Sequence, residues 1–328
     1  MELVVRNVNQ AFSEIFWKLK GLNLAPEQTR NGPAIAFPGL VTTVYKKPIE
    51  RVLFHAGRDA NPVFHLMESI WMLAGRDDVG FLTQFNRRMG SFSDDGKRFN
   101  AAYGYRWRTS FGFDQVDSVI KLLRREPNSR QAVVQIWDSS DLLRDTKDKA
   151  CNTQIVFDIR NGGLNMTVFN RSNDIWWGAY GANAVHFSVL QELVASAVGS
   201  PIGEYRQVSN NFHLYTELYN AKQYIDMPPA HYDYDFYGQQ VVSPRPLMLH
   251  SDYESFLRDC VLFCNDPFNE RVEYSHSYFT DVARPVAQVS RTRRAKAGDG
   301  YNQAMNIQAE DWKLAIINWI ERRETKKA

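Results

Sequence analysis

Cysteine is scarce in this sequence, whose 328 residues include only Cys151, Cys260 and Cys264. So small and odd a number excludes a disulfide framework, and no cysteine–histidine spacing typical of a zinc site occurs. We therefore expect no metal. Cys260 and Cys264 stand four residues apart, the spacing of one helix face, and are expected to be buried core thiols.

Long apolar runs and a biased charge are also missing. No stretch of about 18 apolar residues occurs, so we expect no membrane-spanning segment and no membrane partner. The N-terminus, MELVVRNVNQAF, has no basic start followed by an apolar block, so no secretory signal is expected. The 39 basic and 37 acidic residues give a net charge of +2, which argues against nucleic acid as a partner. These absences predict a cytoplasmic protein.

Repeats and low-complexity linkers are absent as well, and aromatic residues are plentiful at 13%. A chain of this length without a compositional boundary is expected to form one domain over residues 1–328. Apolar periodicity predicts helices at residues 1–20, 63–73, 116–125, 184–198 and around 312–320. Strands are predicted at residues 34–45, 132–137, 153–159 and 164–169. Their irregular alternation indicates an α+β fold with a largely buried sheet.

Two short segments have a predicted local structure. Asn161-Gly162-Gly163 lies between two strand-like runs and predicts a hairpin turn. The basic cluster Arg291, Arg293, Arg294 and Lys296 precedes a Gly-Asp-Gly segment, so a solvated flexible loop is expected. A phosphate contact is the alternative for this cluster, and the sequence does not decide between the two.

Three segments carry residues suited to chemistry. Glu68 is the one carboxylate in the apolar run 63–73, so it either lies on the solvent face of the helix or is buried with a raised pKa. Cys151 lies where a charged loop meets a strand, and nearby cations would lower the pKa of its thiol and make it a nucleophile. Residues 170–174 place a guanidinium, a hydroxyl and a carboxylate at a strand end, which suits an anionic ligand.

Taken together, these segments resemble the thymidylate synthase family, including its phage hydroxymethylase branch acting on deoxycytidylate or deoxyuridylate. Seven motifs match in order: Thr29-Arg30-Asn31-Gly32, Glu68-Ser69-Ile70-Trp71, Tyr103-Gly-Tyr-Arg-Trp-Arg108, Asn128-Ser129-Arg130, Ala150-Cys151, Arg171-Ser172-Asn173-Asp174 and Phe212-His213-Leu214-Tyr215. The resemblance implies a thymidylate synthase-like fold, with a large mixed sheet flanked by helices. Residues 222–328 are the divergent part.

The resemblance also implies a mechanism, in which a cysteine thiolate adds to carbon 6 of a pyrimidine nucleoside monophosphate and activates carbon 5. Its co-substrate is 5,10-methylenetetrahydrofolate. The implied catalytic residues are Cys151, Glu68 and Tyr103. The implied substrate-binding residues are Arg30, Arg171 and Ser172 for the phosphate, with Arg130 from a second subunit, and His213 and Tyr215 for the sugar. Asp174 and Trp71 would contact the folate. A phosphate site shared in this way implies a homodimer.

Departures from the family pattern concern the product. Asn152 follows the cysteine where the synthases have histidine, and residues 72–106 contain no tryptophan to shield the reactive carbon. Residues 321–328 also lack the short apolar tail that closes synthase sites. These departures predict a hydroxymethylase, which would suit a virus with modified DNA and so the host cytoplasm. The alternatives are a methylating synthase shielded by Phe85 or Phe92, and a nonenzymatic nucleotide-binding protein that uses the basic cluster.

The substrate base and sugar stay open at this stage. Asn183 would contact the base, but it stands one residue further along the chain than the family spacing requires. By flipping, its amide can pair with uracil or with cytosine. Deoxyribose is favoured over ribose, with cytidylate as an alternative substrate. Three further residues are expected to have minor roles. His186 is expected at the helix surface or core edge, and Trp176-Trp177 is expected to pack, with stacking on the folate as the alternative.

Overall fold

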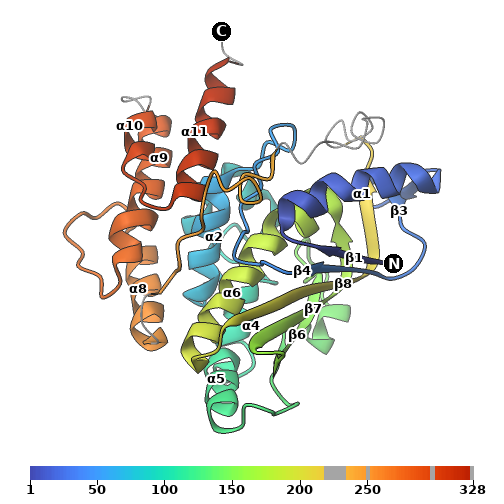
Figure 1. Cartoon of the computed structure of the whole chain (residues 1–328), viewed down its shortest axis with the longest axis horizontal. Coiled ribbons are helices and arrows are strands. Elements are labelled where there is room, and N and C mark those ends of the chain that lie inside the picture. The colour runs from blue at the N-terminus through green and yellow to red at the C-terminus, as the bar shows by residue number, and fades with distance from the viewer. Residues whose placement is uncertain (218–233, 249–251, 296–299, 326–328) are drawn as a thin grey trace.

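A mixed β-sheet forms the centre of the protein (Figure 1). The computed structural model describes residues 1–217, 234–248, 252–295 and 300–325. The strands of the sheet are β1 (Glu2–Val5), β2 (Glu27–Thr29), β3 (Gly32–Ala36), β4 (Val41–Tyr45), β5 (Val133–Gln135), β6 (Asn152–Arg160), β7 (Gly163–Asp174) and β8 (Ile202–Tyr215). Their order is β1-β4-β8-β7-β6-β5, and the β2–β3 hairpin joins the sheet through β3 and β8. β1 runs parallel to β4 and β7 parallel to β8, while the other neighbours are antiparallel.

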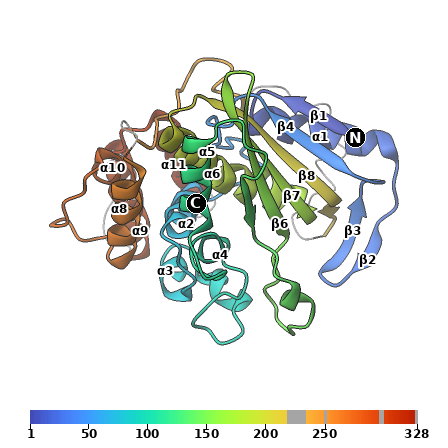
Figure 2. The ribbon, with the colours of Figure 1, turned by 90° about the horizontal axis from the view of Figure 1, so that it is seen from below.

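Helices cover one face of the sheet and then form a further layer. The helices are α1 (Val8–Leu22), α2 (Pro62–Leu73), α3 (Val79–Thr83), α4 (Tyr103–Arg108), α5 (Gln115–Arg125), α6 (Asn183–Val198), α8 (Tyr253–Asn265), α9 (Arg284–Ala295), α10 (Gly300–Met305) and α11 (Glu310–Thr325). Short 3-10 segments are η1 (Arg87–Phe92) and η2 (Ser139–Leu142), and π-helical ones are η3 (Ile175–Ala182) and η5 (Phe279–Ala283). Helix α6 packs on β7 and β8, α2 packs on α6, and α8, α9 and α11 pack on α2 (Figures 1 and 2). The predicted α+β fold with a large mixed sheet flanked by helices is confirmed.

Local sequence determines several of these elements. In the β6–β7 turn, Asn161 and Gly162 both have positive φ, 53° and 80°, as a two-residue type I′ turn requires. Helix α2 begins after the N-cap Asn61 with Pro62 in its first turn, and α6 ends at Gly199, which is left-handed with φ 71°. The predicted helices at 63–73, 116–125, 184–198 and 312–320 are therefore confirmed, as is the hairpin.

Other predictions are corrected by the structure. The first twenty residues are not one helix, because Glu2–Val5 form the edge strand β1 before α1 begins. The strand-like run 34–45 is two strands, interrupted at Gly39, whose φ is 88°. The long strand β8 was not predicted.

The basic cluster is not a flexible loop in its described part. Arg291, Arg293 and Arg294 lie in helix α9, while Lys296 lies outside the described residues. The Arg291 guanidinium stacks on Phe268 and that of Arg293 on Trp319, with 5.4 Å and 4.2 Å to the ring centroids. Such cation–π contacts fix these side chains and explain why the segment is ordered. Cys260 and Cys264, in contrast, are buried on one face of α8, as expected.

Candidate active site

The site lies at the end of the sheet where β6 begins and β7 and β8 end. Because β7 runs antiparallel to β6 and parallel to β8, residues distant in sequence meet there. The Arg171 amide donates to the Cys151 carbonyl oxygen over 2.9 Å, and Asp174 pairs in register with His213. The sheet therefore gathers four of the predicted site residues at one edge.

Cys151 lies between Tyr103 and Arg171. Its backbone N–H donates to the Tyr103 hydroxyl over 3.2 Å, and Nη2 of Arg171 lies 3.9 Å from its Sγ. The Arg171 guanidinium is held in place because Nε donates to the Ala150 carbonyl oxygen over 2.8 Å and the group stacks on Trp137. The thiol is thus partly buried beside a fixed positive charge and a phenol.

The pKa of the Cys151 thiol differs from the prediction. Burial raises it above the ordinary value. The positive charges of Arg171 and Arg30 act to lower it but do not outweigh burial. Asp148 and Asp174 add negative charge and raise the pKa further. The expectation of a lowered thiol pKa is therefore wrong for the free protein, and the charge of Asp148, three residues away in the same loop, is part of the reason.

Tyr103 begins helix α4, and its ring packs on Phe187. Burial raises the pKa of its hydroxyl well above the usual range. The group is therefore neutral at physiological pH and acts through hydrogen bonds rather than as a phenolate.

Glu68 neither faces open solvent nor is fully buried, since its side chain is 15% exposed. Its Oε2 lies 3.2 Å from Nε2 of His186, whose side chain is 4% exposed. This Nε2 has no hydrogen-bond partner with good geometry among the described residues. His186 is therefore buried and does not lie at the helix surface, the first of the two expected positions. Helix α6 turns it toward Glu68 on α2.

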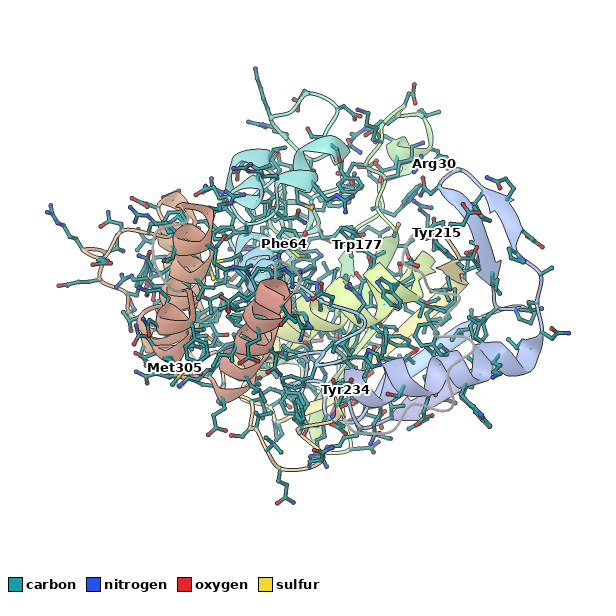
Figure 3. All side chains as sticks on the ribbon, turned by 90° about the horizontal axis from the view of Figure 1, so that it is seen from above. Arg30, Phe64, Trp177, Tyr215, Tyr234 and Met305 are labelled. Atoms are coloured by element: carbon teal, nitrogen blue, oxygen red, sulfur yellow. The ribbon has the colours of Figure 1, made fainter. Side chains whose placement is uncertain are left out.

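Arg30 and Tyr215 lie on the same side of the molecule as Trp177 (Figure 3). Arg30 is exposed in the turn between β2 and β3, next to Asn31, whose Nδ2 donates to the Tyr215 hydroxyl over 3.2 Å. His213 packs edge-on against Tyr215, with ring centroids 4.9 Å apart. The β2–β3 hairpin thus brings a guanidinium to the rim beside the end of β8.

Asp174 caps η3 and keeps one carboxylate oxygen free. Its Oδ2 accepts from the Trp177 N–H over 2.5 Å, whereas its buried Oδ1 has no hydrogen-bond partner among the described residues. Burial raises the pKa of Asp174, and the Trp177 N–H and the nearby His213 oppose that effect. A buried carboxylate oxygen without a donor indicates a place for a ligand that supplies one.

The aromatic residues near Asp174 differ in accessibility. Trp177 is partly buried and faces the exposed Phe92, with ring centroids 6.4 Å apart. Trp176 is 3% exposed and packs on Phe12 and Phe16, in agreement with the packing interpretation. Trp71 is also 3% exposed, and its indole N–H donates to Asp78 over 3.3 Å. The structure therefore places Trp71 in the core, and its contact with the folate stays a prediction.

Asn183 contacts the motif residue Asn173 despite the extra residue before it. The segment η3 between Asp174 and Asn183 is π-helical, with Tyr180 outside helical φ/ψ values (−108°, 21°). A π-helical turn accommodates one inserted residue without ending the helix. The amide Nδ2 of Asn183 donates to Oδ1 of Asn173 over 3.1 Å.

Two predicted residues have few contacts. Ser172 is partly buried on β7, in register with Asn211 on β8. Arg130 is exposed between α5 and β5, and no hydrogen bond or ion pair engages its guanidinium in the described part of the chain. Asn152, which follows the cysteine, is fully buried and turns toward Asn170 instead of into the site.

Sequence reasoning missed four residues: Asp148, Asn173, His186 and Gln207. Asp148 was passed over because the lysines on either side of it suggested a positive loop. Asn173 was quoted in a motif, but its partner Gln207 lies on the unpredicted strand β8. The described residues hold no group of three or more histidine, cysteine or acidic side chains able to bind a metal, and no described helix is long and apolar enough to span a membrane.

Comparison with known proteins gives the following similarities. The sequence model of the family described as thymidylate synthase matches residues 58–240. A protein of Pseudomonas phage M6 named deoxyuridylate hydroxymethyltransferase is 44% identical, and the alignment covers 98% of this chain and 95% of that protein. A protein of Bacillus phage SP01 with the same name is 33% identical over 86% of this chain and 80% of its own length. A thymidylate synthase of Symbiobacterium thermophilum is 30% identical over 46% of this chain and 58% of its own length.

Proposed function

Since the chain belongs to the thymidylate synthase family, we propose that it hydroxymethylates carbon 5 of deoxyuridine monophosphate (dUMP) with methylenetetrahydrofolate. The resemblance noted in the sequence is thereby confirmed. The similarity to two phage deoxyuridylate hydroxymethyltransferases favours uracil over cytosine and a deoxynucleotide over cytidylate. It also makes a nonenzymatic role the weakest of the alternatives.

The position of Cys151 is the observation that carries the proposal. Its sulfur lies 3.9 Å from Nη2 of Arg171, and its backbone N–H donates to the Tyr103 hydroxyl. The thiolate adds to carbon 6 of the pyrimidine, which makes carbon 5 nucleophilic. The neutral Tyr103 hydroxyl, which accepts from the Cys151 N–H, is the group we assign to proton transfer at carbon 5. After carbon 5 has bonded to the one-carbon unit, carbon 5 loses its proton and tetrahydrofolate leaves, which gives an exocyclic methylene. Water then adds to this methylene as the Cys151–carbon 6 bond breaks, which releases 5-hydroxymethyl-dUMP and the Cys151 thiolate.

The residues around Cys151 also suit the nucleotide. Arg30 and Arg171 flank the sulfur from two elements, and both lower the pKa of its thiol. Bidentate guanidinium groups suit a phosphate, and Ser172 adds a hydroxyl donor on the same strand. His213 and Tyr215, at the end of β8, are the groups we assign to the deoxyribose hydroxyl.

The fit of the folate rests on Asp174. Its buried Oδ1 lacks a donor, and Trp177 and Phe92 form an aromatic edge beside it. A pterin ring carries N–H donors along its edge and has a flat aromatic face, so Asp174 would bind the donors and Trp177 the face. When bound, methylenetetrahydrofolate supplies the one-carbon unit.

Glu68 and His186 are the groups we assign to proton movement at the reacting carbon. The imidazole Nε2 lies 3.2 Å from the carboxylate, and neither side chain is more than 15% exposed. The carboxylate holds the buried imidazole in one orientation, and the imidazole accepts or returns a proton.

The face of the sheet turned away from α6 supports the homodimer. Residues on this face of β5–β8 are partly exposed, including adjacent Phe169 and Val208 and adjacent Val133 and Val156. An exposed apolar sheet face suits a second copy related by a two-fold axis. The free guanidinium of Arg130 is then available to the phosphate site of the other subunit.

Product mass spectrometry after incubation with dUMP and methylenetetrahydrofolate tests the proposal. A product heavier than dUMP by CH₂O, absent with Cys151→Ser, is expected. His186→Asn should lower its rate by about 10-fold or more, as for loss of a proton-transfer partner. The control His276→Asn removes another buried histidine, in the outer helical layer, and should leave the rate unchanged. No adduct on dUMP would contradict the proposal.

One observation favours methylation as the second candidate. The pair Phe92 and Trp177 places an indole beside Asp174, although residues 72–106 contain none. Phe85, the other shield considered, is 7% exposed and packs on Phe81 and Phe268 in the core. If Phe92 and Trp177 exclude water, the product is a methylated nucleotide. Dihydrofolate then accumulates in the same assay, whereas hydroxymethylation yields tetrahydrofolate.

A further inference from the structure

A chain of buried amides connects Asn183 to the protein backbone. Nε2 of Gln207 donates to the Ala179 carbonyl oxygen over 3.0 Å and to the Tyr45 hydroxyl over 3.1 Å. Nδ2 of Asn173 donates to Oε1 of Gln207 over 3.1 Å, and Nδ2 of Asn183 donates to Oδ1 of Asn173 over 3.1 Å. We call Gln207 and Asn173 the amide relay.

The direction of this relay is fixed at its far end. A backbone carbonyl only accepts hydrogen bonds, so Gln207 must turn its NH₂ group toward Ala179 and its oxygen toward Asn173. Asn173 must then present its NH₂ group to Gln207 and its oxygen to Asn183. Asn183 in turn must present its NH₂ group to Asn173. Reversing any one amide would place two oxygens or two NH₂ groups face to face in a buried region.

The relay is also well enclosed. Gln207 is 1% exposed, Asn173 2% and Asn183 7%. Asn173 has a second acceptor in the Ser209 hydroxyl, 3.0 Å from Nδ2. Gly178 of η3 lies so close that an added Cβ would stand 2.8 Å from the Asn173 oxygen. Side-chain amides packed this closely have no room to rotate, and water cannot enter to replace their hydrogen-bond partners.

One end of the Asn183 amide stays available. Among the described residues its Oδ1 accepts no hydrogen bond, and it is not one of the fully enclosed unpaired atoms. Its Nδ2 has a second hydrogen after the first is donated to Asn173. The Asn183 backbone is fixed as well, because its carbonyl oxygen accepts from the Tyr205 hydroxyl over 3.2 Å.

We propose that the amide relay determines which pyrimidine base is accepted, by holding the Asn183 amide in one of its two orientations. Asn173 and Gln207 are thus positioning residues for specificity. The proposal rests on the proposed function, in which Asn183 contacts the base and the base is uracil. It also changes the expectation from sequence, because a relay that prevents flipping removes the ability of Asn183 to pair with both bases.

The two bases require opposite amide orientations. Uracil offers an N–H at position 3 and an oxygen at position 4, whereas cytosine offers a bare nitrogen at position 3 and an amino group at position 4. An amide that accepts from N3–H and donates to O4 of uracil therefore meets cytosine with both pairs mismatched. In a buried site these mismatched hydrogen-bonding groups stay unpaired, so the site discriminates strongly between the two bases.

Two variants provide the test. Asn173→Ala removes the acceptor opposite Asn183 and releases its amide. Ser209→Ala removes only the second acceptor of Asn173 and leaves the links to Gln207 and Asn183 intact. For each protein, kcat/KM is measured separately with dUMP and with deoxycytidine monophosphate (dCMP). We expect Asn173→Ala to lower the dUMP/dCMP ratio by about 10-fold or more, because dCMP turnover rises relative to dUMP turnover. Ser209→Ala should keep the ratio within about threefold of the unmodified enzyme.

A second variant covers a failure of the first to fold. Gln207→Met is close in shape, contacts Asn173 but not Asn183, and removes the anchor to Ala179; it should also lower the ratio. An equal loss of both activities, with the ratio unchanged in Asn173→Ala and Gln207→Met, would overturn the proposal, since it would show a purely structural role. A preference of the unmodified enzyme for dCMP would overturn the proposed substrate instead, and the change in ratio still tests the relay.

Discussion

Two guanidinium groups near the Cys151 sulfur lower the pKa of the thiol, whereas two carboxylates and burial raise it. The result is a raised pKa of the thiol, so the free enzyme holds its nucleophile mainly protonated at neutral pH. Activation must then accompany substrate binding. Asp148 is the residue through which this can be tested, because its buried carboxylate accepts from the Ala101 N–H and lowers the reactivity of Cys151 through its charge.

Asp148→Asn should make Cys151 more reactive. Removing a negative charge near the sulfur favours the thiolate, so the pKa of Cys151 falls and alkylation at pH 7.5 should speed up by at least about threefold. Asparagine keeps the acceptor for the Ala101 N–H, which limits structural change. The measurement is the iodoacetamide rate at Cys151 followed by peptide mass spectrometry. Asp145→Asn, an exposed residue of the same loop, is the control and should change nothing; a slower reaction of Asp148→Asn would contradict the electrostatic account.

At the scale of elements, the predictions succeeded where a pattern is local. The β6–β7 hairpin follows from Asn161-Gly162, and α2 and α6 follow from their apolar runs and caps. Strand β8 was missed because two of its inward-facing positions are Gln207 and Ser209, which break the expected alternation of apolar and polar residues. These polar residues belong to the amide relay or contact it, so the same feature that hid the strand serves the site.

His186 was misplaced for a related reason. Helix α6 is buried on nearly all sides, so its periodicity does not show which face meets the site. Only the packing of α2 against α6 brings His186 to Glu68, a contact across 118 residues that no local pattern contains. The motif residues Cys151, Arg171, Asp174 and His213 were grouped by family resemblance, and the structure does place them at one end of the sheet.

At the scale of elements, we predict the effect of substituting Gly178 in η3. Gly178→Ala would place a methyl group 2.8 Å from the Asn173 oxygen and so push Asn173 away from Asn183. We expect kcat/KM for dUMP to fall by about 10-fold or more, with an unfolding temperature lowered by a few degrees. Gly80→Ala in α3 is the matched control, because its added Cβ meets only an ordinary contact at 3.8 Å. Full activity of Gly178→Ala would show that Asn173 has room to move.

At the scale of the whole molecule, the site and the open sheet face belong to the same strands. β7 turns Asn173 toward the helices and Phe169 toward the opposite face, and β8 does the same with Ser209 and Val208. A partner on the open face would therefore pack directly behind the substrate site. The position of Arg130 at a surface loop fits such an arrangement, because the guanidinium has no partner in its own described chain.

Subunit mixing tests the shared site. Arg130→Ala and Cys151→Ala should each be inactive, since one lacks the phosphate contact given to its partner and the other lacks the nucleophile. A mixed dimer holds one site with both residues intact, so mixing equal amounts after partial denaturation should restore about a quarter of the unmodified activity. Steady-state assays before and after exchange provide the measurement. Activity that stays absent after exchange, with dimers present in sedimentation analysis, would contradict the shared site.

The amide relay also limits how this enzyme can evolve. The single change Asn183→Asp would offer cytosine an acceptor, but it would also place a carboxylate oxygen against the Asn173 oxygen. Asn173 cannot turn around in response while Gln207 is anchored on the Ala179 carbonyl. A lineage that switches bases must therefore change two or three buried positions on separate elements of the fold, and the intermediates lose activity on the old base before they gain the new one. Base choice is then expected to persist over long divergence, even where the surface and the outer helices of such enzymes change freely.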